Sequence, residues 1–219
     1  MTADHAETAE ATEHGESAAT GSAQARQATG AGRASASRTI PPSAPEFRRA
    51  LGEFATGVTV ITAADAEGPV GFACQSFASV SLDPPLVLFC AGHSGRSWPR
   101  IRAVGQFCVN VLGEHQDDLC RRFGSSNGEK FDGLAWETSR WGTPALPGVL
   151  LRVHAEVDAV HVAGDHDVVI GRVLELETET GPAPLVFFRG GFGLEPSAPA
   201  PSAADWALAG PWGWGDHWD

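Results

Sequence analysis

The chain has no apolar run long enough to cross a membrane. A membrane-spanning helix needs about 20 consecutive apolar residues, and the apolar runs in these 219 residues are shorter. The N-terminal stretch also lacks the basic start and apolar core of a secretory signal, and its early acidic residues disfavour a transit peptide. We therefore expect a soluble, cytoplasmic protein without a membrane partner.

Cationic residues are also few. The sequence has 15 Lys and Arg against 27 Asp and Glu, for a net charge of -12, and Lys130 is its single lysine. Nucleic-acid-binding domains usually carry a basic patch or stripe that contacts phosphates. The arginines here are scattered along the chain, so we expect no nucleic-acid partner.

Signature motifs of several enzyme classes are missing. Without a GxGxxG motif after a strand, neither NAD nor FAD can be held by a Rossmann unit. No GxSxG elbow is present, which argues against a serine hydrolase. His154, His161 and His166 lack HExxH spacing and companion cysteines, so no zinc site is expected.

The cysteines form no CxxC pair and lie inside apolar stretches, at Cys74, Cys90, Cys108 and Cys120. Reduced structural thiols are the favoured interpretation, and they fit a cytoplasmic protein better than a disulfide scaffold does. The spacing leaves open a pair that meets in space.

The two ends of the chain differ in composition from its middle. Residues 1–43 have almost no large apolar side chains and cannot bury enough surface to offset their ordering entropy, which predicts a disordered extension. Residues 194–219 form a tail rich in Pro and Trp. The tail either packs over its own domain or a dimer mate, or acts as a lid or partner-docking segment. One domain is expected at 44–193.

Within this domain, local patterns predict mostly short strands. Ser43 and Glu46 have the spacing of a capping box, and the apolar residues that follow predict a helix that ends near Gly57. Further patterns predict helices at 98–104 and 114–123, and strands at 58–62, 86–91, 107–112, 168–176 and 185–188.

Residues 151–159 alternate strictly between apolar and polar side chains. This alternation predicts a half-solvated antiparallel strand with His154 on its solvent face. Because short strands recur with turn signals and few helices intervene, we predict a mainly β fold, a closed or nearly closed barrel. A doubly wound sheet would need long helices between its strands.

The stretch at 75–89 combines small hydroxyl side chains, two prolines and an apolar strand. Ser76, Ser79 and Ser81 can donate hydrogen bonds to a planar heterocycle or a phosphate. The prolines remove backbone donors and stiffen the chain. The pattern indicates either a backbone-lined ligand loop or a polar β-meander with a rigid turn.

Four motifs flank this stretch in a fixed order: FRRALGEFATGVTVIT at 47–62, SGRSW at 94–98, FCVNVL at 107–112 and GDH at 164–166. In this order they resemble the short-chain flavin reductases, the reductase components of two-component flavin monooxygenases. The resemblance implies the FMN-binding split barrel, a Greek-key-like antiparallel β-barrel with a few peripheral helices. It also implies a homodimer with flavin near the interface.

The resemblance further implies a flavin site. It places the flavin ring against residues 75–82 and the flavin phosphate against SGRSW, whose guanidinium and hydroxyls suit a phosphate. From its type alone, Arg96 would be an ordinary surface arginine. The implied cofactor-binding residues are Gln75, Ser76, Phe77, Ser79, Val80, Ser81, Leu82, Ser94, Arg96, Ser97, Phe123, Lys130, Phe131 and Asp165.

The GDH turn is the implied nicotinamide contact. The resemblance places it beside a cleft where nicotinamide stacks on flavin, with His166 as the catalytic residue that helps to position the nicotinamide. A lone histidine in a turn is otherwise usually a solvated residue. Hydride transfer depends on close stacking and orientation more than on acid or base groups.

The predicted function is an NAD(P)H:flavin oxidoreductase that reduces FMN or FAD by hydride transfer and releases it to a separate monooxygenase. Two alternatives share the fold: a flavin carrier without activity, and a flavoenzyme that retains its flavin and acts on its own substrate. FMN against FAD stays open. NADH is favoured over NADPH because no arginine pair lies near His166 in sequence, although Arg172 and Arg189 can approach it in space.

Overall fold

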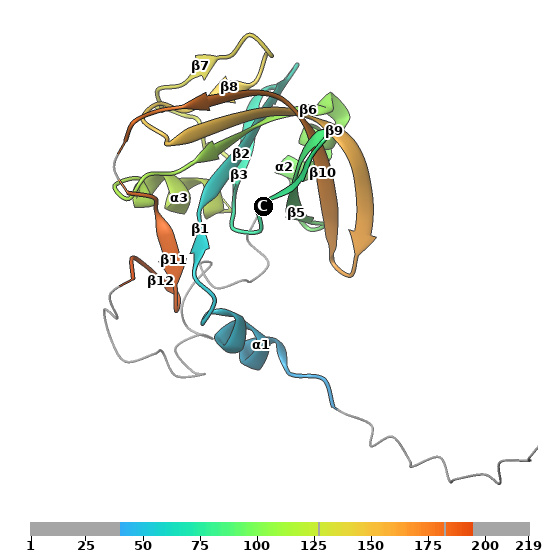
Figure 1. Ribbon diagram of the computed structural model, residues 1–219, viewed down its shortest axis with the longest axis vertical. Helices are drawn as coiled ribbons and strands as arrows, with labels where there is room; N and C mark the ends of the chain where they lie inside the picture. Colours follow the sequence, from blue (N-terminus) through green and yellow to red (C-terminus); the bar gives the residue numbers. More distant parts are fainter. Residues whose placement is uncertain (1–39, 127, 182, 195–219) are drawn as a thin grey trace, which may run out of the picture. The chain divides into compact units, whose positions relative to one another are not determined.

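A curved, seven-stranded antiparallel sheet dominates the computed structural model, which describes residues 40–194 except 127 and 182 (Figure 1). Most of the predicted extension at 1–43 and of the predicted tail at 194–219 lies outside the described residues. The strands run in the order β3-β2-β6-β9-β10-β5-β4. Their bounds are β2 (Thr59–Asp65), β3 (Gly68–Cys74), β4 (Ala78–Leu82), β5 (Pro85–Gly92), β6 (Gln106–Val111), β9 (Leu151–Ala163) and β10 (His166–Thr178).

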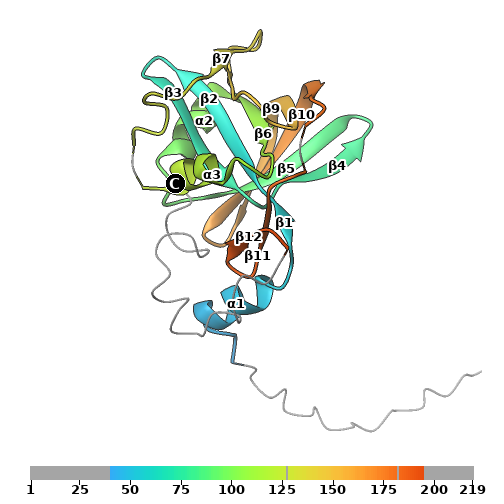
Figure 2. The same cartoon turned by 90° about the vertical axis from the view of Figure 1, so that its left-hand side faces the viewer.

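Smaller elements surround this sheet. The remaining strands are β1 (Thr56–Gly57), β11 (Val186–Phe188) and β12 (Gly191–Phe192), which form one small sheet, and β7 (Glu137–Thr138) and β8 (Pro144–Ala145), which form another. The helices are α1 (Ala44–Leu51), α2 (Ser97–Val104) and α3 (Asp117–Gly124). Helices α2 and α3 pack beside β2 and β3 (Figure 2). No helix among the described residues is long and apolar enough to span a membrane.

The sheet is barrel-like but open, which confirms the predicted mainly β, antiparallel fold. Strands β3 and β4 are its edges, so its hydrogen-bonded ladder does not close. Ser76, just after β3, partly bridges the opening, because its Oγ accepts a 2.8 Å hydrogen bond from the backbone N–H of Cys90 on β5. Curvature brings β10 close to β6: a Cβ added at Gly171 would lie 2.5 Å from Phe107 Cζ, so this approach requires glycine.

Two apolar clusters fill the interior. In one, Phe89 packs edge-on against Phe107 and Trp98, with ring centroids 5.1 and 5.9 Å apart. In the other, Phe123 of α3 and Leu112 are fully buried and belong to a cluster that also includes Phe187 of β11. The four cysteines are free thiols, as predicted. Burial raises the pKa of Cys108 and of Cys120 to about 12, so both thiols stay protonated at neutral pH.

The predicted solvent exposure of His154 is wrong. Its side chain is fully buried, with Nδ1 3.3 Å from Thr143 Oγ1 and Nε2 3.0 Å from Glu177 Oε1. The alternation along β9 separated an apolar face from a polar face, but it could not show that another segment covers the polar face. The segment leading through β8 packs over that face, and Thr143 and Leu146 are themselves buried there.

Two predicted helix boundaries also differ. The capping box before α1 is present, since the backbone N–H of Ser43 donates a 2.9 Å hydrogen bond to Glu46 Oε2. The helix nevertheless ends at Leu51, and Gly52, not Gly57, is its C-cap. No residue of α1 is buried, and its apolar residues Phe47 and Leu51 are 48 % and 38 % exposed, so the described chain covers its apolar side only in part. Helix α3 begins at Asp117, because the preceding residues form a turn closed by Gln116.

Candidate functional site

Two pockets border consecutive parts of the edge strand β3. The larger, here called the His166 pocket, has a volume of about 550 Å³ and is bordered by the end of β3, by β5, by the β9–β10 turn and by α1. The smaller, here called the Arg96 pocket, has a volume of about 250 Å³ and is bordered by the start of β3, by α2 and by residues 128–131. Small-molecule sites commonly span about 300 to 1,000 Å³.

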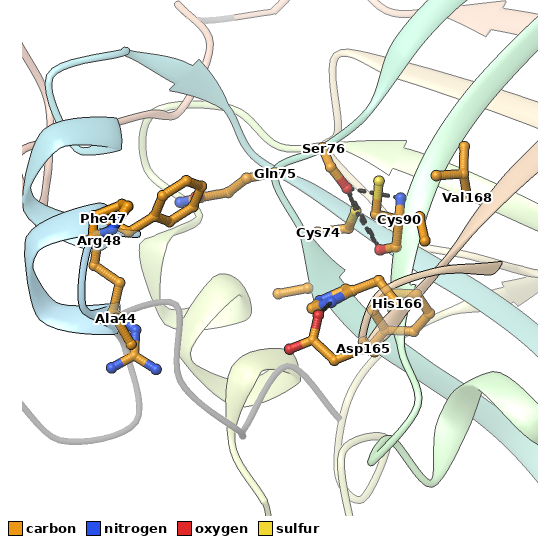
Figure 3. A pocket seen from close by; sticks show the side chains of 15 residues that line it. Ala44, Phe47, Arg48, Cys74, Gln75, Ser76, Cys90, Asp165, His166 and Val168 are labelled. Carbon is orange, nitrogen blue, oxygen red and sulfur yellow. Dashed lines mark hydrogen bonds and ion pairs between the residues drawn. The ribbon is translucent and has the colours of Figure 1, made fainter. Parts of the chain in front are cut away.

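The His166 pocket brings together residues of the first motif, at 47–62, and of the last one, GDH at 164–166. Gln75, Ser76, Asp165 and His166, all predicted site residues, border it. Phe47 and Arg48 on α1 lie across the pocket from Ser76, Asp165 and His166, and the Gln75 side chain extends toward Phe47 (Figure 3). Its walls are largely apolar with a few polar groups, which suits a planar heterocycle held by edge contacts.

One hydrogen-bond donor at the His166 pocket has no acceptor among the described residues. The Nε2 atom of Gln75 is buried and has no hydrogen-bond partner among the described residues. A buried donor without a partner costs about 1 to 3 kcal/mol, and a ligand carbonyl would remove that cost. The residues present therefore fit a flavin or nicotinamide edge.

The GDH turn presents His166 in a fixed orientation. Gly164 occupies the left-handed region at φ 70°, as the tight β9–β10 turn requires. His166 Nδ1 lies 2.8 Å from Asp165 Oδ1, and this hydrogen bond lowers the pKa of the Asp165 carboxyl. The other ring nitrogen, Nε2, lies beside Gly92, 3.6 Å from where a Cβ on that residue would be.

The Arg96 pocket collects the predicted phosphate ligands other than Ser94. Arg96, Ser97, Lys130 and Phe131 border it, together with Arg100. Arg100 is held by two hydrogen bonds of 2.6 and 2.7 Å to the Asp65 carboxylate, which lower the pKa of that carboxyl to about 2. Lys130 is only 6 % exposed, so an anion bound beside it would be partly shielded from water.

The remaining predicted residues do not border either pocket. Ser79, Val80, Ser81 and Leu82 lie on the edge strand β4, where Leu82 is 95 % exposed. Phe77 packs against the first core cluster. Phe123 is fully buried and packs edge-on against Phe131, at 5.1 Å between ring centroids. Ser94 lies near the His166 pocket, its Oγ 4.0 Å from the Cβ position of Gly92.

The sequence analysis missed the contribution of α1. Pro42, Ala44, Phe47 and Arg48 border the His166 pocket. A signal was present, because an amphipathic helix whose apolar side lacks a core to pack against often covers a ligand or a partner. Arg100 was also missed, since nothing in its local pattern separates it from other helix arginines.

One group of possible metal ligands occurs among the described residues. A nitrogen of His154 and carboxylate oxygens of Glu175 and Glu177 lie within 4.8 Å of one another. Each is already engaged, His154 by Thr143, Glu175 by Arg140 and Trp141, and Glu177 by Arg152. These ion pairs already supply the counter-charge, so the group carries no metal assignment.

Comparison with known families decides the classification. The model described as "Flavin reductase like domain" matches residues 51–194, most of the described part of the chain. The chain belongs to this family. Its relatives include the reductase subunit HsaB of a flavin-dependent monooxygenase from Rhodococcus jostii, 48 % identical over 177 residues, which span 80 % of this chain and 89 % of that protein.

Solved structures of the flavin reductase-like family agree with this fold. Component B of nitrilotriacetate monooxygenase from Mycobacterium thermoresistibile is 49 % identical, with a TM-score of 0.66 over 71 % of this chain and 89 % of that one. The NADH:FAD oxidoreductase SgcE6 from Streptomyces globisporus, solved with NAD and FAD fragments, is 32 % identical, with a TM-score of 0.65 over 70 % and 94 %. The predicted family and split-barrel fold are confirmed.

Proposed function

We propose that this protein is an NADH-dependent flavin reductase that reduces FMN or FAD and supplies it to a separate monooxygenase. The observation that carries the proposal is the His166 pocket, where Gln75 and Ser76 border the same cavity as Asp165 and His166 of the GDH turn in a chain of this family. Bound flavin would supply the hydride acceptor. The chain's own residues need only bind and orient the two ligands, because hydride transfer depends on their alignment.

The residues divide this work between the two pockets. In the His166 pocket, Gln75 Nε2 is a buried donor without a partner among the described residues, which a ligand carbonyl would satisfy once the amide turns toward the cavity, and His166 Nε2 lies beside Gly92, where the nicotinamide would bind. In the Arg96 pocket, Arg96 and Lys130 provide cations for the flavin phosphate. Asp165 fixes the orientation of the His166 ring through Nδ1.

Two arginines outside the His166 pocket bear on the choice between NADH and NADPH. Arg172 is paired with Asp158 and Glu156 across β9 and β10. Arg189 donates two hydrogen bonds, of 2.7 and 3.0 Å, to Glu53. Both arginines are therefore engaged by carboxylates, which weakens their attraction for a 2′-phosphate. Arg48 borders the His166 pocket itself, so the choice of NADH rests on relatives such as the "FMN reductase (NADH) SmoA" of Agrobacterium fabrum, which is 47 % identical over 147 residues.

A direct test separates the reductase from its alternatives. Purified protein is mixed anaerobically with NADH or NADPH and with FMN, FAD or riboflavin, the absorbance at 340 nm is followed, and ultrafiltration then locates the reduced flavin. Rapid oxidation with reduced flavin in the filtrate is expected. Flavin binding without oxidation would instead identify a carrier, and retained reduced flavin would identify a self-contained flavoenzyme.

The His166→Ala substitution is expected to raise the KM for NADH or lower turnover about 10- to 100-fold, because it removes the ring that orients the nicotinamide. His115→Ala, at a histidine whose side chain is 82 % exposed, is the matched control. Steady-state kinetics with circular dichroism check both variants. Wild-type kinetics in the His166 variant would remove this residue from the site.

We further propose a homodimer in the cytoplasm. The apolar side chains of Phe47 on α1 and of Phe54, three residues after the helix ends, are 48 % and 72 % exposed and need a cover that the described chain does not provide. The four free thiols fit a reducing compartment. Sedimentation analysis is expected to show a dimer that the Phe54→Asp substitution weakens. A wild-type monomer at micromolar concentration would contradict this proposal.

A further inference from the structure

One buried carboxylate, Asp167, connects the GDH turn with the segment that carries the SGRSW motif. Asp167 follows His166 at the start of β10, and successive side chains of a strand point to opposite faces. His166 therefore borders the pocket, whereas Asp167 is turned inward and is only 3 % exposed. Asp167 belongs to none of the predicted site residues.

Three donors converge on this carboxylate. His93 Nε2 lies 2.9 Å from Oδ1, and Trp98 Nε1 donates to Oδ2 at 2.8 Å. Arg102 adds a longer contact of 3.4 Å from an exposed side chain. The hydrogen bonds from Trp98 and then from His93 lower the pKa of Asp167, so the group is a carboxylate at neutral pH.

All three donors come from one continuous segment. His93 and Trp98 enclose residues 94–97, the part of the SGRSW motif that carries the predicted phosphate ligands. The backbone N–H of His93 also donates a 2.9 Å hydrogen bond to the carbonyl of Asp165. The segment is thus attached to the GDH turn twice, once through the main chain and once through Asp167.

We propose that Asp167 is a positioning residue, which acts through His93 and Trp98 to hold the phosphate-binding segment in register with the GDH turn. This inference rests on the proposed function, because only a reductase needs both ligands aligned at once. Misplacement by about 1 Å can lower the rate of such a reaction by about 100-fold. Ser97 Oγ, hydrogen-bonded to the carbonyl of Gly71 at 2.9 Å, fixes the far end of the segment to β3.

The test uses Asp167→Asn, His93→Leu and His93→Gln in the full-length protein. Glutamine can place an amide donor near the position of the histidine Nε2, whereas leucine cannot. Glu177→Gln is the matched control, since Glu177 also lies on β10 and also pairs with a histidine and an arginine, away from both pockets. The measurements are hydrogen exchange of residues 92–98 without ligands, Kd for FMN, kcat, KM for NADH and Tm.

Asp167→Asn and His93→Leu are expected to speed exchange in residues 92–98, weaken FMN binding about tenfold and lower kcat about tenfold. His93→Gln is expected to stay within about twofold of wild type. Glu177→Gln is expected to lower Tm without changing exchange in 92–98 or the FMN Kd.

Two outcomes overturn the role of Asp167. One is a lower Tm in Asp167→Asn with unchanged exchange, FMN Kd and kcat, which would make the carboxylate purely structural. The other is a His93→Gln variant as impaired as His93→Leu. Wild-type protein that oxidises no NADH would overturn the proposed function instead, and the exchange and FMN-binding measurements, which need no turnover, would still decide whether Asp167 holds the segment.

Discussion

The Gly92→Val variant is expected to lose about 100-fold in kcat/KM for NADH while keeping its fold. Gly92 ends β5, pairs with His166 and borders the pocket. A Cβ at this position would meet His166 Nε2 at 3.6 Å, an ordinary contact, so the Gly92→Ala variant should retain most activity. The two γ-methyl groups of valine extend further and compete with the nicotinamide for the space beside the ring.

Gly57→Val is the control for this prediction. Gly57 also lies in a strand and is exposed, and a Cβ added there meets nothing within 4 Å. Stopped-flow measurement of NADH oxidation at saturating FMN separates the variants, and Tm confirms folding. Equal activity in Gly92→Val and Gly57→Val would show that the space beside His166 is not used in the reaction.

Much of the fold follows from local patterns. The capping box at Ser43 and the buried strand around residue 107 were predictable because capping chemistry and strand periodicity act over a few residues. The GDH turn was expected from the family resemblance. The burial of His154 was not predictable, because it depends on a segment that packs over β9 from outside the strand. Periodicity identifies the faces of a strand but not their neighbours.

The site was only partly predictable for a similar reason. Of the two interpretations of residues 75–89, the β-meander with a turn holds from Ala78 onward, because β4 begins there and pairs with β5. The residues of β4 follow the sheet edge, away from both pockets. Gln75 and Ser76 stay at the opening between β3 and β5. The positions of the α1 residues at the His166 pocket and of Asp167 could be found only from the tertiary structure, because the residues that they contact are distant in sequence.

The Arg96→Ala variant is expected to bind FMN about 10- to 100-fold more weakly, with no change for riboflavin. Arg96 donates a hydrogen bond to the carbonyl of Ser126, which holds its guanidinium at the Arg96 pocket. A charge-assisted hydrogen bond to phosphate contributes about 1.5 to 3 kcal/mol, and each 1.4 kcal/mol changes Kd about tenfold. Riboflavin has the same ring but no phosphate, so it reports any indirect effect on the ring site.

Flavin fluorescence quenching at two salt concentrations measures the Kd for FMN and the Kd for riboflavin. Arg140→Ala is the matched control, because Arg140 is 68 % exposed and pairs with Glu175 outside both pockets. Added salt should weaken FMN binding to wild type more than to Arg96→Ala, since screening acts on the charge contact that the variant has lost. If FMN and riboflavin binding weakened equally, Arg96 would act by holding Ser126 in place, and the phosphate would bind elsewhere.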